Sequence, residues 1–216
     1  MISNHDLRDF EVAAPYIKTN LEQLNLVATE EVVRKLYDFV NLLFKWNKAY
    51  NLTAVRDFNQ MFPSHIWDSL VVSPFLEGRS CLDIGTGAGL PGIPLAILNP
   101  DIRFVLLDSN GKKTRFVQQA KTELGMENVE VVHSRIENYQ PGFEFDCLIS
   151  RAVDTISGLI KPASHLFHPK NVFLFLKSRE VSEELELLSD EYGKKLVQLN
   201  VPDLEAERFL IQVRYN

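Results

Sequence analysis

Residues 80–96, SCLDIGTGAGLPGIPLA, join an apolar strand to a glycine-rich turn and then to an apolar helix. Within the turn, Gly85, Gly87, Gly89 and Gly92 each allow the backbone to take a positive φ or to approach a bound molecule without a Cβ in the way. An ordinary connecting turn does not need that freedom four times in eight residues. We therefore expect this loop to bind a ligand and the function to lie at its edges.

Acidic residues and prolines around the loop indicate which ligand it binds. Residues 87–92 fit the fingerprint of a dinucleotide-binding turn, and Asp108 follows near the spacing of a ribose-binding acid. A dinucleotide needs free amides at the helix N-terminus, where Pro91 and Pro94 each remove an N–H group. Asp83 is costly in the apolar strand end unless it binds a ligand or caps the turn. S-adenosylmethionine has a sulfonium, an ammonium and a ribose diol but no phosphate, so we favour it over a nicotinamide dinucleotide.

The composition is that of a globular protein of one domain with added elements. The chain has 216 residues, of which 45% are hydrophobic, and it shows neither a membrane-length apolar run nor an apolar leader, so we expect it in the cytoplasm, away from membranes. Cys81 and Cys147 lie in apolar runs and are expected to be reduced, buried thiols. The net charge of −6 provides no general attraction to nucleic acid, so any RNA contact must come from a local basic patch.

The first 75 residues predict helices and no strand. One helix runs from the N-cap Thr29 to about Trp46, and residues 51–54, NLTA, interrupt the pattern. A second helical pattern covers residues 58–75, with a break near Pro63. We expect residues 1–75 to form a helical cap packed on a main domain of residues 76–216.

From residue 80 onward, short apolar strands alternate with helices. Helices are expected from Pro91, from Lys112 and over 156–166. The expected strands are residues 81–84, 104–107, 129–132, 145–150 and 172–176, followed by a hairpin of residues 195–201 and 208–213. Such alternation is typical of an α/β fold with helices on both faces of a parallel sheet. We predict a Rossmann-like fold with a mostly parallel seven-stranded sheet and a C-terminal antiparallel hairpin.

In such a sheet, the ligand lies beyond the carboxyl ends of the strands. Besides the glycine loop, this edge should carry Asp108, whose carboxylate can accept two hydrogen bonds from a ribose diol or cap the next helix. Ile136 and Glu137 can enclose an adenine, although Glu137 also fits a solvent-exposed position. Arg151 ends the fourth strand and Lys177 the fifth.

Basic and aromatic residues near this edge are candidates for RNA contacts. They are Lys112, Lys113, Arg115, Arg151 and Lys177 around the site, and Trp46, Asn47 and Asn51 from the cap. Each basic residue alone also fits a solvated face, and Trp46 equally fits core packing. His65 and Asp68 are about one helical turn apart, which favours a structural His–Asp interaction over catalysis, and no cluster has metal-ligand spacing.

Six motifs resemble those of a known family over nearly the whole chain from about residue 40. They are KWNKAYNLTAVRD (45–57), HIWDSL (65–70), LDIGTGAGLPGIPLA (82–96), LLDSNGKKTRF (106–116), SRIE (134–137) and ISRA (149–152). In this order they resemble the glucose-inhibited division protein B family, the RsmG-type small-subunit rRNA methyltransferases. The resemblance implies a class I methyltransferase fold. It also implies methyl transfer from S-adenosylmethionine to N7 of one guanine in the 16S rRNA decoding region, with S-adenosylhomocysteine as product.

The resemblance also implies which residues bind the cofactor. The family's contacts fall on Gly85, Leu90, Ile136, Glu137 and Arg151, with Asp108 at the ribose and Arg151 in a positioning role, while Asp83, Gly87 and Gly89 are our candidates from the loop itself. The chain departs from the family pattern at Ser64, Val153 and Ser178, where a basic residue, an aromatic residue and a glycine are usual. The implied partner is 16S rRNA, free or within a small ribosomal subunit or its assembly intermediate, and we expect the protein to act as a monomer.

Guanine N7 has an in-plane lone pair and carries no proton, so its methylation needs alignment and no general base. Proximity and orientation can supply about 7–11 kcal/mol of that catalysis. The sequence ISRAVD after the fourth strand lacks the NPPY or DPPY tetrapeptide that grips an exocyclic amine, and Cys147 is too apolar in setting to serve as the nucleophile for cytosine methylation. Two alternatives stay open, a methyltransferase of small molecules and a non-catalytic nucleotide-binding or assembly factor.

Overall fold

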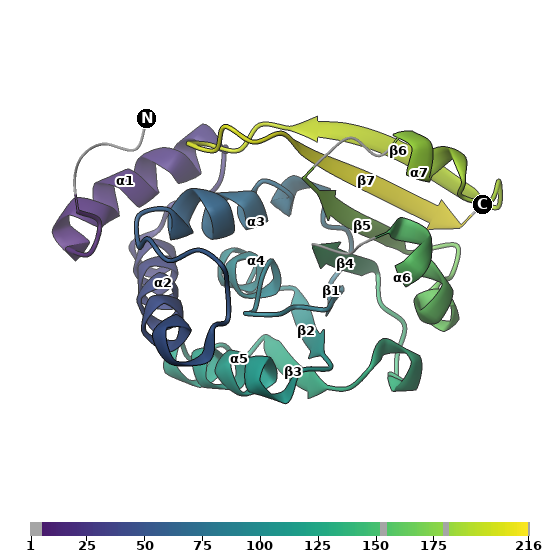
Figure 1. Cartoon of the computed structure of the whole chain (residues 1–216), viewed down its shortest axis with the longest axis horizontal. Coiled ribbons are helices and arrows are strands. Elements are labelled where there is room, and N and C mark those ends of the chain that lie inside the picture. Colours follow the sequence, from purple (N-terminus) through teal and green to yellow (C-terminus); the bar gives the residue numbers. More distant parts are fainter. Residues whose placement is uncertain (1–5, 152–154, 179–181, 216) are drawn as a thin grey trace.

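The computed structural model describes residues 6–151, 155–178 and 182–215, which form an α/β fold around one sheet (Figure 1). The strands are β1 (Ser80–Ile84), β2 (Arg103–Asp108), β3 (Val129–His133), β4 (Cys147–Arg151), β5 (Val172–Lys177), β6 (Tyr192–Leu199) and β7 (Arg208–Tyr215). The α-helices are α1 (Phe10–Gln23), α2 (Glu30–Tyr50), α3 (Asp68–Leu70), α4 (Gly92–Leu98), α5 (Gly111–Glu123), α6 (Ile156–Ala163) and α7 (Ser182–Glu186). Shorter turns are the π-helix η1 (Phe62–Trp67) and the 3₁₀ turns η2 (Ser73–Phe75), η3 (Ile136–Asn138) and η4 (Ser164–Leu166).

The described strands form a seven-stranded sheet in the order β3-β2-β1-β4-β5-β7-β6. Strands β1 to β5 are parallel, and β7 lies antiparallel between β5 and β6. The strand order reverses between β1 and β4, so the connections after these two strands leave on opposite sides and open a crevice at their carboxyl ends. The Rossmann-like class I methyltransferase fold, with its seven strands and C-terminal hairpin, is therefore as predicted.

Helices cover both faces of the sheet because the strand residues are apolar on both sides. In β1, Cys81 faces the core cluster that contains α2, α4 and α5, whereas Leu82 faces the cluster that contains α6. In β2, Phe104 faces the same cluster as Cys81, and Val105 faces the same cluster as Leu82. Figure 1 shows α2, α4 and α5 on one face and α6 on the other. This burial on two sides explains the continuous apolar runs of the central strands.

Helix α2 links the N-terminal helices to the sheet. Its N-cap is Thr29, as predicted, with Oγ1 accepting a hydrogen bond of 3.2 Å from the Val32 amide. The helix continues one turn beyond the predicted end, to Tyr50, because Asn51 there takes a left-handed conformation with φ 51° and closes it. Its buried side chains belong to the same core cluster as Cys81 of β1. The helical cap and the sheet thus share one core, while the division after residue 75 stays a prediction.

The segment predicted as a second cap helix is broken into several turns. Residues 62–67 form a π-helix, in which the Asp68 amide reaches back to the Pro63 carbonyl, and α3 and η2 follow. The proline without an N–H group explains why a regular α-helix does not continue through this segment. Strand β4 begins at Cys147 instead of residue 145, and α7 was not predicted.

The remaining expectations concern the cysteines and membranes. Cys81 and Cys147 are register partners on β1 and β4, and both are buried free thiols, as expected. Burial raises the pKa of the Cys81 thiol well above its usual range. No helix within the described residues has both the length and the apolar character that crossing a bilayer requires.

Candidate functional site

The glycine loop lies directly after β1, at the carboxyl edge of the sheet. Gly85, Gly87 and Gly89 have φ angles of 73°, 60° and 77°, which a residue with a side chain rarely adopts. Gly92 is needed for a different reason. A Cβ at this position would clash with the Leu106 side chain and lie 2.7 Å from Oδ2 of Asp83. The glycines therefore combine the two uses expected from the sequence, a left-handed backbone and a close approach.

Asp83 is fully buried and holds the glycine loop to the start of α4. Its Oδ2 accepts hydrogen bonds from Thr86 Oγ1 at 2.6 Å and from the Gly92 amide at 2.9 Å. Burial raises the pKa of Asp83 to about 7, although these two hydrogen bonds and the charge of Arg151 act in the opposite direction. Its other oxygen, Oδ1, has no hydrogen-bond partner among the described residues. Asp83 therefore caps the turn and also offers one buried acceptor, so the two roles weighed from the sequence are compatible.

Asp108, at the end of β2, joins the second strand to the same loop. Its Oδ2 accepts the Gly87 amide at 2.8 Å, and its Oδ1 accepts the Asn110 amide at 2.7 Å. Asn110 in turn caps α5 by accepting from the amides of Lys112 and Lys113. A carboxylate oxygen can accept more than one hydrogen bond, so each still has capacity for a ribose hydroxyl. The ribose contact stays a prediction.

The first turn of α4 has few amides to offer a phosphate. The Gly92 amide donates to Asp83, and the Ile93 amide donates to the Gly89 carbonyl at 2.7 Å. Pro94 has no N–H group, and the Leu95 amide donates to the Pro91 carbonyl at 3.2 Å. The amides that a pyrophosphate would need are therefore already used within this part of the chain, which agrees with a ligand that has no phosphate.

Three further predicted cofactor residues differ in burial. Leu90, in the loop itself, is buried. Ile136 is nearly buried in the 3₁₀ turn η3 after β3, and Glu137 beside it is exposed. Lys113 reaches from α5 to the loop, because its Nζ is 3.8 Å from the position that a Cβ on Gly87 would occupy. The structure thus brings a cationic side chain to the loop, while the adenine contacts of Ile136 and Glu137 stay predictions.

Arg151, at the end of β4, takes part in an ion-pair network with the cap. Its Nη1 donates to Asp68 Oδ2 at 3.0 Å and to the Ser64 carbonyl at 3.3 Å. The other carboxylate oxygen of Asp68 accepts from Arg208 Nε at 2.6 Å. Asp68 is buried, and both arginine side chains are only 17% exposed. Arg208 was not predicted as a site residue, because only the insertion of β7 beside β5 brings the first residue of β7 to this edge.

The predicted His65–Asp68 interaction is electrostatic, because the charge of Asp68 acts to raise the pKa of His65, while none of the described hydrogen bonds joins the two side chains. His65 Nε2 instead lies 2.8 Å from Thr53 Oγ1, and His65 Nδ1 lies 2.8 Å from the Ser64 carbonyl oxygen. The π-helix changes the angular spacing that the prediction assumed, because each of its turns holds more residues than an α-helical turn. Burial, followed by the charge of Arg151, lowers the pKa of His65 to about 4. A neutral His65 therefore connects the loop after α2 to the carbonyl that Arg151 contacts.

Most predicted RNA contacts lie at the ends of α2 and α5. Lys112 and Arg115 are exposed on the first turns of α5, and Lys113 is half-buried. Asn51 is exposed at the end of α2, where its Oδ1 accepts from Arg56 Nη2 at 2.8 Å. Because α2 packs against α5, these basic and polar residues share the edge that carries the glycine loop.

Two predicted RNA residues are not presented to a partner, which corrects the expectation for them. Asn47 is buried, with Nδ2 donating to the Val55 carbonyl at 2.9 Å and Oδ1 accepting the Thr53 amide at 2.9 Å. Lys177 is buried and pairs with Glu184 Oε2 at 3.2 Å. Asn47 shapes the loop after α2, and Lys177 fastens the end of β5 to α7. Trp46, the aromatic residue among the RNA contacts predicted from the cap, is half-buried.

The positions that depart from the family pattern have different settings. Ser64 contributes its backbone carbonyl to His65 and Arg151. Ser178 is exposed just after β5, and Val153 lies outside the described residues. The described histidines, cysteines and carboxylates contain no group that could hold a metal ion.

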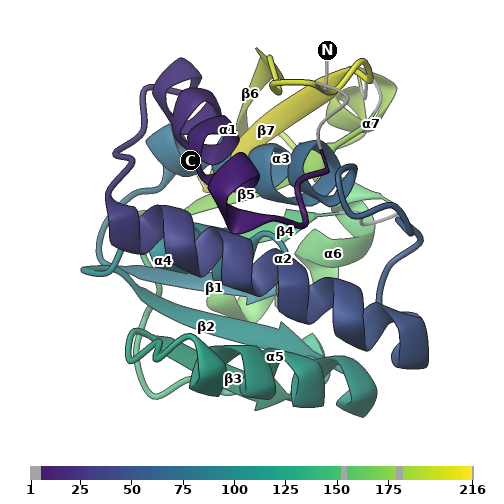
Figure 2. The ribbon, with the colours of Figure 1, turned by 90° about the vertical axis from the view of Figure 1, so that its left-hand side faces the viewer.

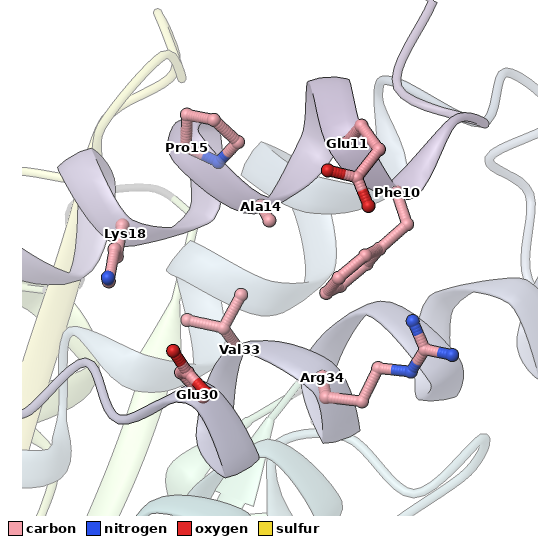
Figure 3. A pocket seen from close by; sticks show the side chains of 8 residues that line it. All are labelled: Phe10, Glu11, Ala14, Pro15, Lys18, Glu30, Val33 and Arg34. Atoms are coloured by element: carbon pink, nitrogen blue, oxygen red, sulfur yellow. The ribbon is translucent and has the colours of Figure 1, made fainter.

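A pocket between α1 and α2 lies apart from this edge, near the N-terminal end of α2 (Figure 3). Its apolar floor includes Phe10 and Val33, while Glu11 and Glu30 are balanced by nearby lysine and arginine side chains. None of the predicted site residues lines it. The glycine loop and the strand ends around it therefore remain the candidate site.

Comparison with known proteins identifies the family. The profile of the GidB family, described as rRNA small subunit methyltransferase G, matches residues 32–211. A ribosomal RNA small subunit methyltransferase G from Psychromonas ingrahamii is 48% identical over 90% of this chain and 94% of its own length. The protein of the same name from Shewanella baltica is 46% identical over 91% of this chain and 96% of its own.

Solved structures show the same fold at low sequence identity. The O-methyltransferase TomG from Streptomyces achromogenes, solved in complex with SAM, has a TM-score of 0.60 at 17% identity, covering 93% of this chain and 96% of its own. A putative O-methyltransferase from Klebsiella pneumoniae has a TM-score of 0.58 at 13% identity, with the same coverage. These structures show the fold, and the match to a methyltransferase family supports S-adenosylmethionine as the cofactor. The chain belongs to the rRNA small subunit methyltransferase G family.

Proposed function

We propose that the protein transfers a methyl group from S-adenosylmethionine to N7 of one guanine in 16S rRNA. The observation that carries this proposal is the chemistry at the end of β4. Ser150 is buried and donates its hydroxyl to the Ile84 carbonyl at 2.7 Å, while Arg151 is a cation paired with Asp68. Neither residue can take a proton from a nucleophile, and guanine N7 has no proton to lose.

The buried residues of the loop fit the proposed cofactor. The unpaired Oδ1 of Asp83 suits a cationic group or a hydroxyl, and a carboxylate that would otherwise stay protonated gains most from such a partner. We assign Asp108 to the ribose and Ile136 to one face of the adenine. When bound, S-adenosylmethionine supplies a methyl group on a positively charged sulfur.

The reaction then needs only an in-line arrangement. The N7 lone pair forms a bond to the methyl carbon as the carbon–sulfur bond breaks, and the bonding pair leaves with sulfur to give a neutral thioether. The positive charge passes to the guanine ring, and no covalent enzyme intermediate is formed. The protein holds the guanine in line and excludes water, which can account for about 7–11 kcal/mol. Arg151, whose Nη1 is held by the Ser64 carbonyl and by Asp68 of the cap, is the residue we assign to positioning the reactants.

The RNA must present the guanine outside a regular helix. In an A-form duplex, N7 faces a deep and narrow groove, so a flipped or unpaired guanine is the expected substrate. Lys112, Lys113 and Arg115 supply positive charge beside the loop, and Trp46 and Asn51 belong to the same edge. This local patch compensates for the overall charge of −6.

The decisive test is a chemical-cleavage map of N7-methylguanosine in 16S rRNA. Purified protein and cofactor are incubated with unmodified naked rRNA, assembly intermediates or mature small subunits, and the cleavage at methylated guanines is compared. We expect one new cleavage site with at least one of these substrates. The proposal is abandoned if none of them gains N7-methylguanosine.

A methyltransferase of small molecules is tested by charge reversal on α5. Lys112→Glu with Arg115→Glu, both exposed on the first turns of α5, should abolish methylation of rRNA, whereas Lys121→Glu, at the other end of the same helix, should leave it nearly unchanged. An enzyme acting on a small molecule would tolerate both changes. A non-catalytic assembly factor would bind subunits without any methyl transfer. Calorimetry with S-adenosylmethionine and NAD tests the ligand assignment, which tight NAD binding would contradict.

A further inference from the structure

Three aromatic rings form a ladder from the core to the surface at the end of α2. Phe116 of α5 is fully buried, and its ring centroid lies 5.6 Å from that of Trp46. Trp46 is half-buried, and its ring lies 5.1 Å from that of Tyr50, with an interplanar angle of 31°. Tyr50 is 51% exposed. The outermost ring of the ladder is therefore Tyr50, which partly covers Trp46.

The geometry of the two helices places Tyr50 at the edge that carries the proposed site. Figure 2 shows α2 and α5 side by side along one face of the sheet. Leu42 lines a groove with Glu123 and Leu124, near the end of α5, whereas Trp46 meets Phe116, nearer its start. The two helices are therefore antiparallel. One turn beyond Trp46, Tyr50 approaches the first turn of α5.

That first turn of α5 is positively charged. Lys112 is exposed, and Lys113 extends its ammonium group over the glycine loop, 3.8 Å from the Cβ position of Gly87. Arg56 is exposed and is held at 2.8 Å by Asn51, the residue that follows Tyr50. An exposed aromatic ring near cationic side chains is the combination that binds single-stranded nucleic acid, because bases stack on the ring and phosphates lie against the charges.

The ring is also held in place before any ligand binds. Tyr50 is the last residue of α2, and the helix is closed by the Asn51 amide, which donates to the Asn47 carbonyl at 3.1 Å. Asn47 is itself buried and anchored to the following loop. A tyrosine on such a helix end loses little conformational freedom on binding, so it offers a rigid stacking surface.

We propose that Tyr50 stacks on an unpaired base of the rRNA that flanks the target guanine, while the adjoining phosphates lie against Lys112 and Lys113. The inference rests on the proposed function and names a residue of its RNA interface. The sequence predicted Trp46 for such a base contact. We assign the contact to Tyr50, one helical turn later, because the Trp46 ring already packs against Phe116 and Tyr50. Every base has a face that can stack on an aromatic ring. Tyr50 should therefore raise the affinity for rRNA without selecting a particular base.

The test compares substitutions at Tyr50 with a matched substitution at Tyr215. Tyr215 is 41% exposed and also contacts another ring, that of Tyr192, but it ends β7 at the opposite edge of the sheet. Binding of unmodified naked 16S rRNA and of small subunits is measured at one fixed salt concentration, with the cofactor affinity and the melting temperature as checks on folding. Naked rRNA distinguishes a base contact from a contact with a ribosomal protein.

Stacking predicts a specific order of affinities. Tyr50→Phe should bind like the wild type, because it keeps the ring. Tyr50→Leu and Tyr50→Ala should bind naked rRNA roughly 5- to 150-fold more weakly, the range expected for the loss of one base–aromatic stack. Tyr215→Leu should bind like the wild type. All variants should keep the affinity for S-adenosylmethionine.

Three results overturn the inference while the wild type still methylates rRNA, so that the proposed function stands. In the first, Tyr50→Leu binds naked rRNA as tightly as Tyr50→Phe. In the second, only binding to assembled subunits is weakened, which assigns the ring to a protein partner. In the third, Tyr215→Leu weakens binding as much as Tyr50→Leu. If the wild type itself neither binds nor methylates rRNA, the proposed function fails, and this inference fails with it.

Discussion

Asp68 and Arg151 form an ion pair of 3.0 Å across 83 residues of sequence. The second oxygen of Asp68 pairs with Arg208 at 2.6 Å, so one buried carboxylate holds two guanidinium groups. The pairs connect the helical cap, the end of β4 and the start of β7. Arg151 is thereby fixed next to the glycine loop by a residue of the helical cap.

Replacement of Asp68 should be strongly destabilising. In Asp68→Ala, two largely buried guanidinium groups lose their shared partner, so we expect the free energy of unfolding to fall by about 3–5 kcal/mol. Urea unfolding monitored by circular dichroism measures the change. The matched control is Glu130→Ala, which breaks the pair of Arg103 and Glu130 at 2.7 Å, where both side chains are about half exposed. It should cost less than about 1 kcal/mol. Equal costs for the two variants would contradict a structural role of the buried network.

Local sequence patterns predicted the central sheet and the glycine loop well. The central strands are continuous apolar runs buried on both faces, so they can be recognised from the sequence of each run. Because β1 and β2 are parallel, Asp83 and Asp108 near their carboxyl ends then lie at one edge of the sheet. The N-cap at Thr29 was predictable because the capping threonine and the acidic first turn that follows it are neighbours in sequence. These features depend on short-range chemistry or on a simple topological rule.

Features that depend on long-range packing were missed or wrong. Arg208 reaches the site because β7 inserts between β5 and β6, and no local signal records that order. The predicted His65–Asp68 contact assumed α-helical spacing, which the π-helix does not have. Asn47 and Lys177 carry the right chemistry for RNA, but burial redirects Asn47 to the loop backbone and Lys177 to Glu184.

The stability of the protein should depend on His65 at mildly acidic pH. Burial and Arg151 lower its pKa to about 4, below the ordinary value of 6.5 that it regains on unfolding. Between these pH values the unfolded chain binds more protons, so stability falls as the pH is lowered from about 6.5 to about 4, by up to about 3 kcal/mol. Unfolding free energies at several pH values should show this loss in the wild type relative to His65→Gln. The same pH dependence in both proteins would exclude His65 as its source.

Asp83 should have the opposite effect over an overlapping range. Burial raises its pKa to about 7 from the ordinary value of 3.8, so between these pH values the folded chain binds more protons than the unfolded chain. Stability contributed by the protonated form is therefore lost as the pH rises from about 4 to about 7, by roughly 4 kcal/mol at most. Compared with Asp83→Asn, which cannot ionise, the wild type should lose stability over this range. In the wild type, His65 and Asp83 change the stability in opposite directions over this pH range. The quantity to measure is therefore the difference in unfolding free energy between the wild type and Asp83→Asn. A difference that does not change with pH would contradict the raised pKa of Asp83.

Cofactor binding should be linked to ionisation of the same carboxyl. A cationic ligand next to Oδ1 favours the ionised form of Asp83, so affinity for S-adenosylmethionine should rise between about pH 6 and pH 8, with release of a proton. Calorimetry in buffers of different ionisation enthalpy counts that proton. Asp83→Asn should bind more weakly and without this pH dependence. S-adenosylhomocysteine, whose sulfur is a neutral thioether, tests whether the charge of the ligand matters, because it should bind with a weaker pH dependence. Affinity independent of pH in the wild type would mean that Asp83 does not face the charged part of the ligand.

Gly92→Ala should destabilise the protein, although this glycine has no left-handed backbone. The added methyl group would collide with the buried Leu106 side chain and lie 2.7 Å from Asp83 Oδ2, which accepts the Gly92 amide. Such overpacking costs about 1–3 kcal/mol. Gly142→Ala is the control, because no described atom lies within 4 Å of its added Cβ and its backbone suits alanine. That change should be neutral or stabilising by up to about 1 kcal/mol, since it restricts the unfolded chain. Urea unfolding measures the change in the free energy of unfolding for both variants. If close packing against Asp83 selects glycine at position 92, Gly92→Ala should lower this free energy and Gly142→Ala should not. Equal effects would mean that the start of α4 can move away from β1 and β2 without loss.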